Sequence, residues 1–83
     1  MTKILVIDDE RSIRNSMKDI LQYEGHDVVL AENGLEGLVS VKSEKPDIVF
    51  CDIKMPKMDG LSMIRQAKEM GASCDFVILS GYA

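Results

Sequence analysis

Two stretches decide the fold of this chain: residues 3–9, which read KILVIDD, and residues 47–52, which read DIVFCD. In each, a short apolar run is followed at once by aspartate. Because neither run alternates between polar and apolar residues, both are typical of strands buried on both faces of a parallel sheet. Ligands of open α/β sheets bind at the carboxyl ends of the strands. The sequence therefore predicts that Asp8, Asp9 and Asp52 meet at one edge of a sheet.

Such a cluster of carboxylates has a chemical consequence. The three groups repel one another, and each raises the cost of ionising the next. The cluster therefore favours a bound cation, and hard oxygen ligands suit Mg²⁺, which binds through one or two carboxylates together with water and phosphate oxygens. The residues indicate a metal-assisted phosphoryl site. Taken alone, Asp8 and Asp9 are equally consistent with a role as caps that interact with the positive N-terminus of the following helix. Asp52 alone is consistent with a residue of a turn.

The rest of the chain alternates between extended and helical patterns. The predicted strands are residues 3–7, 27–31, 47–51 and 75–79. The predicted helices are residues 11–24, 34–45 and 60–70, with Asn33 and Asp59 as N-caps of the second and third. Their buried stripes are expected to contain Ile13, Met17, Ile20 and Leu21, then Leu35, Leu38 and Val39, then Leu61, Ile64 and Ala67. This order, β-α-β-α-β-α-β, predicts one α/β domain with a parallel sheet over residues 1–83.

Composition excludes several classes of protein. A hydrophobic content of 46% in 83 residues argues against disorder, and a net charge of −4 argues against nucleic-acid binding by this segment. No apolar stretch approaches membrane-spanning length. Cys51 and Cys74 have neither CxxC nor CxxH spacing, which is typical of reduced thiols. We therefore expect a cytoplasmic protein without membrane contact.

Four motifs in order resemble the receiver domain of two-component response regulators. They are residues 8–10 (DDE), 46–52 (PDIVFCD), 55–60 (MPKMDG) and 77–81 (VILSG). The resemblance covers the whole chain. It implies a flavodoxin-like (CheY-like) fold with sheet order 2-1-3-4-5. It also implies that the protein accepts a phosphoryl group from a phosphohistidine of a sensor histidine kinase.

The resemblance also implies a role for individual residues. Asp52 corresponds to the phosphoacceptor, Asp9 to the direct Mg²⁺ ligand, and Asp8 to its partner, which acts through water. The backbone carbonyl of Lys54 corresponds to a further metal ligand. Ser80 corresponds to the hydroxyl residue that hydrogen-bonds the phosphoryl group and moves in the switch. The implied protein is a phosphoacceptor in phosphorelay signalling and not an enzyme in the usual sense.

The chain departs from the family after its last strand. Family members continue through a helix, a fifth strand bearing a lysine that pairs with the phosphoryl group, and a final helix. We therefore expect residues 1–83 to be the first two-thirds of one receiver, with strand order 2-1-3-4, the fifth strand and last two helices absent, and impaired phosphorylation. The apolar strand 75–79 would then be an exposed edge, which favours a homodimer or larger assembly.

Two other functions stay open. One is an inert or assembly-forming fragment that keeps the motifs without the switch. The other is a phosphatase with an aspartyl nucleophile. Such enzymes have Asp-x-Asp after the first strand, so Asp8-Asp9-Glu10 disfavours that class.

Overall fold

A computed structural model describes residues 2–79. It contains seven helices and strands over that range. The elements are β1 (Lys3–Ile7), α1 (Arg11–Tyr23), β2 (Asp27–Ala31), α2 (Gly34–Glu44), β3 (Ile48–Asp52), α3 (Gly60–Glu69) and β4 (Asp75–Leu79). Each boundary lies within one residue of the sequence-based prediction. The predicted order β-α-β-α-β-α-β is therefore confirmed.

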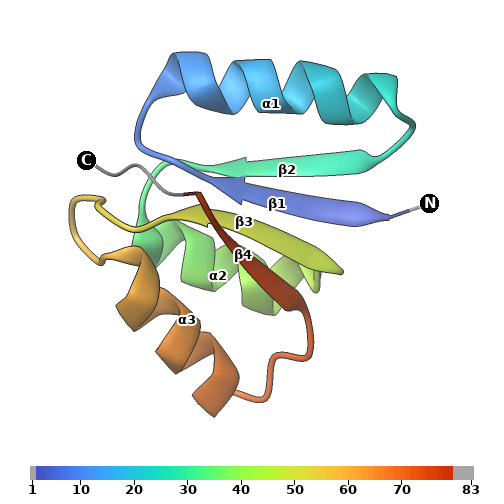
Figure 1. Cartoon of the computed structure of the whole chain (residues 1–83). Coiled ribbons are helices and arrows are strands. Elements are labelled where there is room, and N and C mark those ends of the chain that lie inside the picture. The colour runs from blue at the N-terminus through green and yellow to red at the C-terminus, as the bar shows by residue number, and fades with distance from the viewer. Residues whose placement is uncertain (1, 80–83) are drawn as a thin grey trace.

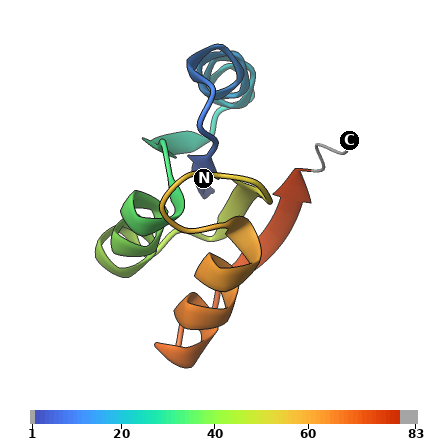
Figure 2. The same ribbon diagram turned by 90° about the vertical axis from the view of Figure 1, so that its left-hand side faces the viewer.

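The strands form one parallel sheet in the order β2-β1-β3-β4 among the described residues, as predicted. Their register aligns Ile7 with both Ala31 and Cys51, and Cys51 with Ile78. Helix α1 covers one face of the sheet, while α2 and α3 cover the other (Figure 1). All four strands consequently end at the same edge, which Figure 2 shows from outside.

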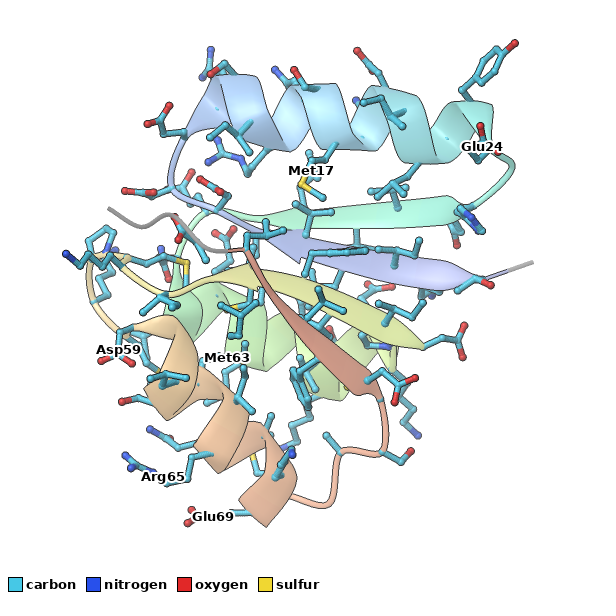
Figure 3. The ribbon with its side chains drawn as sticks, in the orientation of Figure 1. Met17, Glu24, Asp59, Met63, Arg65 and Glu69 are labelled. Carbon is cyan, nitrogen blue, oxygen red and sulfur yellow. The ribbon has the colours of Figure 1, made fainter. Side chains whose placement is uncertain are left out.

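The main core lies between the sheet and the pair α2 and α3. Leu5, Val49, Cys51 and Met63 are 0% exposed within it. In Figure 3, Met63 points from α3 toward the sheet, whereas the neighbouring charged side chains of that helix point away. Burying one large apolar side chain contributes about 1.5–3 kcal/mol. This layer therefore supplies much of the stability of the domain.

Helix α2 approaches the sheet through glycines and not through the residues we predicted. Its buried residues are Gly34, Gly37 and Val41, while Leu35 and Val39 are 47% and 66% exposed. The prediction that Leu35 and Val39 are buried was wrong. A Cβ at Gly37 would lie 3.0 Å from Ile7 Cγ1, so a larger residue at that position requires the flexible end of the Ile7 side chain to shift.

Helix α3 has the same phase. Gly60, Met63 and Ala67 are buried, Ile64 packs against the core, and Leu61 is 59% exposed. The expectation of a buried Leu61 was therefore wrong. Both α2 and α3 begin with a glycine that lies in close contact with a neighbouring segment. The residues three, four and seven positions after that glycine then face the sheet. This fixed start turns the second residue of each helix outward.

Helix α1 packs mainly on β2 and β1. None of its residues is fully buried, and Ile20 is 63% exposed, which corrects the prediction of a buried stripe. Met17 points from α1 toward the sheet in Figure 3. On the same face of the sheet, Val77 of β4 is 41% exposed, because α1 lies over the other half of the sheet.

Candidate functional site

The carboxyl edge of the sheet carries a cluster of three carboxylates. Asp8 and Asp9 follow β1, and Asp52 is the last residue of the adjacent strand β3. One carboxylate oxygen from each residue lies within 4.8 Å of the other two. The strand pattern thus brought together the three residues that were expected to meet. Carboxylate oxygens are the type of ligand that Mg²⁺ prefers.

Asp8 is the buried member of the cluster, with 2% of its surface exposed. Burial raises the pKa of its carboxyl group, and the charges of Asp52, Asp9 and Glu10 raise it further. The backbone N–H of Glu10 donates to Asp8 Oδ1 at 2.9 Å and opposes part of this rise. The edge of the sheet therefore holds an acidic group whose ionisation is costly until a positive charge arrives.

The other two carboxylates are more accessible. Asp9 is exposed and Asp52 is half-buried, so the cluster opens to solvent on one side. Asp52 is also fixed in place, because its backbone belongs to β3 and is aligned with Leu79 of β4. An accessible carboxylate on a rigid strand end is suited to attack an incoming group, since positioning supplies much of the rate in such reactions.

A cation from α1 reaches the margin of the cluster. Arg14 Nη1 donates to the backbone carbonyl of Asp8 at 2.7 Å. This contact fixes the turn that carries Asp8 and Asp9 to the first turns of the helix. Arg14 was not predicted from the sequence to belong to the site. The one available signal was its place just inside the predicted helix, six residues after Asp8, where a long side chain can fold back.

The loop between β3 and α3 forms the other wall of the site. It is held by hydrogen bonds from Gly60 N–H to the Ile53 carbonyl and from Met58 N–H to the Pro56 carbonyl, both 2.8 Å. Lys57, at the centre of the second bond, has a φ of 73°, which is unfavourable for a residue other than glycine. Strained backbone of this kind concentrates at functional sites.

The predicted N-cap at the end of this loop is present. Asp59 Oδ1 accepts from the Ser62 backbone N–H at 2.8 Å, and this bond holds the pKa of Asp59 below its usual value. A Cβ at Gly60 would lie 3.0 Å from the Asp52 carbonyl carbon and 3.1 Å from Cys51 Sγ. Only glycine therefore lets α3 start directly against the end of β3.

Two other residues were predicted to belong to the site. Lys54 lies exposed in the β3–α3 loop, two residues past Asp52. Ser80 lies outside the described residues. Cys51, beneath Asp52, is fully buried, and burial together with the charge of Asp52 raises the pKa of its thiol to about 12. This thiol is therefore neutral at physiological pH.

The fold and the site together define a parallel α/β domain with an acidic site at the carboxyl ends of its strands. Over residues 4–83 the chain matches the response regulator receiver domain, and it belongs to that family. This confirms the resemblance seen in the sequence motifs. Members of the family are phosphoacceptors of two-component systems, interact with sensor histidine kinases and bind Mg²⁺ at an acidic pocket.

Curated relatives are larger proteins. The chain is 38% identical over 78 residues to the response regulator MprA of Mycolicibacterium vanbaalenii, covering 94% of this chain and 34% of that protein. The response regulator MprA of Mycobacterium avium is 37% identical over the same length, with the same coverage. The chain thus spans about a third of the length of these relatives.

Solved structures share the fold. The N-terminal domain of an uncharacterised protein from Wolinella succinogenes matches with a TM-score of 0.95 at 30% identity, covering 100% of this chain and 67% of that one. The response regulator TrrA of Thermotoga maritima, solved in complex with Mg²⁺-BeF, matches with a TM-score of 0.92 at 37% identity, covering 100% and 72%. The CheY-like fold is therefore confirmed. Within residues 2–79, no helix has the length and apolar character needed to cross a bilayer.

Proposed function

We propose that this chain accepts a phosphoryl group on Asp52 from a sensor histidine kinase, with Mg²⁺ held by Asp8, Asp9, Asp52 and the backbone carbonyl of Lys54. The observation that carries the proposal is the convergence of three carboxylate oxygens within 4.8 Å at the carboxyl edge of the sheet. The family match and the Mg²⁺-BeF complex of the relative TrrA support it.

Asp52 is the best acceptor on three grounds. Asp8 is almost fully buried and one of its oxygens already accepts a hydrogen bond. Asp9 lies outside the strands, in the bend before α1. Asp52 combines partial exposure with a backbone fixed inside the sheet.

The proposed reaction is a single in-line transfer. A carboxylate oxygen of Asp52 attacks phosphorus, the new O–P bond forms, and the P–N bond to the histidine ring of the kinase breaks with its electron pair returning to the imidazole. When bound, Mg²⁺ supplies neutralisation of the charge that spreads over the phosphoryl oxygens. The negatively charged carboxylates of Asp8 and Asp9 would hold the metal ion, while the packed end of β3 keeps the attacking oxygen of Asp52 in place.

Further parts of the proposal concern the chain as a whole. We propose that residues 1–83 form the first two-thirds of one receiver domain, a share that agrees with the 67% of the Wolinella domain that they match. Ser80 remains the predicted hydrogen-bond partner of the phosphoryl group. Cys51 and Cys74 are free thiols, in keeping with the predicted cytoplasmic location.

Incubation with Mg²⁺ and a small acyl phosphate, followed by intact mass measurement, tests this function. We expect slow and incomplete addition of one phosphoryl group to the unsubstituted chain, and none to Asp52→Asn. Asp19→Asn, which removes the same charge from an exposed position of α1, is the matched control and should label like the unsubstituted chain. Label retained by Asp52→Asn would contradict the assignment. Release of phosphate without a retained adduct would indicate a phosphatase, and absence of label on every variant would indicate an inert chain.

A further inference from the structure

We propose that the turn between β2 and α2, residues 31–34, is a spacer that sets the distance between the two walls of the acidic site, and that Gly34 is its positioning residue. One wall carries Asp8 and Asp9, and the other carries Asp52 and the β3–α3 loop. The inference rests on the proposed function, because the distance matters for binding Mg²⁺ between the walls.

The spacer is tied to the first wall by a backbone hydrogen bond. The Asp8 N–H donates to the Ala31 carbonyl at 3.1 Å, one residue beyond the last paired residue of β1. Ala31 is 1% exposed, so this bond is shielded from competing water. The position of Asp8 is therefore fixed relative to the first residue of the turn.

The spacer touches the second wall at Gly34. A Cβ built on Gly34 would lie 2.8 Å from both the carbonyl carbon and the Cβ of Met58, closer than real Cβ atoms approach their neighbours, and it would also meet the Met58 carbonyl oxygen. Figures 1 and 2 both show the β3–α3 loop passing beside the start of α2. Backbone thus rests directly on backbone, with no side chain between them that could yield.

The spacer itself is stiff. Asn33, 7% exposed, accepts from the Glu36 backbone N–H at 2.8 Å. Glu36 in turn accepts from the Glu32 backbone N–H through Oε1 at 2.9 Å. These two bonds close the turn on the first turn of α2. A displacement imposed at Gly34 therefore passes to the loop and is not absorbed in the turn.

The backbone of the β3–α3 loop has little freedom to move. Its bonds from Met58 N–H to the Pro56 carbonyl and from Gly60 N–H to the Ile53 carbonyl bracket the segment, and Lys57 already has a strained φ of 73°. A shift of Met58 is consequently passed back along the loop toward Lys54 and Asp52.

The size of the effect follows from the contact distance. Carbon atoms pack at roughly 3.5–4.0 Å, so a methyl group at position 34 requires the Met58 backbone to move by about 1 Å. Loss of the contacts that orient metal ligands typically weakens metal affinity by about 10–100-fold. We expect Gly34→Ala to weaken Mg²⁺ binding by about 10-fold or more.

Titration of the full chain with Mg²⁺, followed by the amide NMR shifts of Asp9 and Asp52, tests the spacer. Gly37→Ala is the matched control, because it adds the same methyl group to the same helix, against the Ile7 side chain. Weakened binding in Gly34→Ala with near-normal binding in Gly37→Ala supports the inference. Equal affinity of Gly34→Ala and the unsubstituted chain overturns it. Absence of Mg²⁺ binding by the unsubstituted chain would instead refute the proposed function, and this inference with it.

A second pair of variants covers the case in which Gly34→Ala does not fold. Lys57→Gly removes the strain of the positive φ and gives the loop room to move. The double variant with Gly34→Ala should then fold and still bind Mg²⁺ more weakly than Lys57→Gly alone. Equal binding by these two proteins overturns the inference. Failure of the double variant to fold also overturns it, because the contact would then serve folding and not positioning.

Discussion

Replacing Asp8 by asparagine is expected to stabilise the metal-free protein at neutral pH. Asp8 is 2% exposed, and its pKa is raised above its ordinary value of 3.8, chiefly by burial. An acid whose pKa is raised by folding contributes full stability below its unfolded pKa, and that stability is lost as pH rises through the folded pKa. At pH 7 the ionised carboxylate is therefore a burden on the fold, and the neutral amide removes it.

The magnitude follows from the distances in the cluster. For two unit charges 4.8 Å apart, Coulomb's law gives about 1 kcal/mol in water and about 3.5 kcal/mol at an effective dielectric constant near 20. The exposed Asp9 contributes near the lower figure, and the half-buried Asp52 contributes more. Asparagine keeps an oxygen that can accept from the Glu10 N–H. We expect a net gain of about 1–3 kcal/mol in the free energy of unfolding, at about 4–8 °C of melting temperature for each kcal/mol.

Thermal melts followed by circular dichroism in EDTA provide the assay. Asp8→Asn should melt above the unsubstituted chain at pH 7, and the gap should close as pH falls and Asp8 is protonated. Asp19→Asn, an exposed change of the same charge, should show little difference. Mg²⁺ should stabilise the unsubstituted chain more than the variant, by mass action on the folded state. An Asp8→Asn protein that melts at or below the unsubstituted chain in EDTA at pH 7 would refute the reasoning.

Four further outcomes are expected. Asp9→Asn should weaken Mg²⁺ binding sharply in calorimetry, and an unchanged affinity would remove Asp9 from the site. Asn33→Ala should cost about 1 kcal/mol in urea denaturation, because the N-cap bond to α2 is lost; no change would show that the cap is dispensable. A thiol reagent should label Cys74 before Cys51 in the native state, because Cys51 is fully buried and has a thiol pKa near 12; equal rates would contradict this. A protein made of residues 1–83 alone should self-associate through β4, the edge strand among the described residues, where Val77 is 41% exposed, and Val77→Pro should disrupt association or folding; a monodisperse, cooperatively melting monomer in light scattering would contradict it.

The elements of this fold were predictable because their signals are local. An apolar run such as Ile4–Ile7, in a chain that alternates strands with helices, is typical of a strand buried on both faces of a parallel sheet. An aspartate directly after such a run then lies at the carboxyl edge of the sheet. The convergence of Asp8, Asp9 and Asp52 followed from that argument alone. The N-cap roles of Asn33 and Asp59 were equally local, since each depends on the backbone three residues later.

The faces of the helices were not predictable in the same way. Apolar spacing in α2 and α3 allows more than one stripe, and the choice between them depends on how closely each helix approaches the sheet. That approach is set by Gly34 and Gly60, whose partners lie 24 and 8 residues away along the chain, at Met58 and Asp52. The contact of Arg14 with the Asp8 carbonyl is likewise a property of the folded turn. None of these leaves a periodic mark in the sequence.

The glycine at the start of α2 and the glycine at the start of α3 separate two properties of the domain, the geometry of its site and its thermal stability. Backbone contact at the first residue of each of these helices fixes how the helix approaches the site. The buried apolar side chains farther along the helices, such as Val41 and Met63, chiefly set the melting temperature of the domain. Substitutions there should retune the working temperature of the domain and leave the carboxylates where they are. Proteins with this architecture can therefore adapt to hot or cold habitats by substitutions among buried apolar residues, without a change in the geometry of the acidic site.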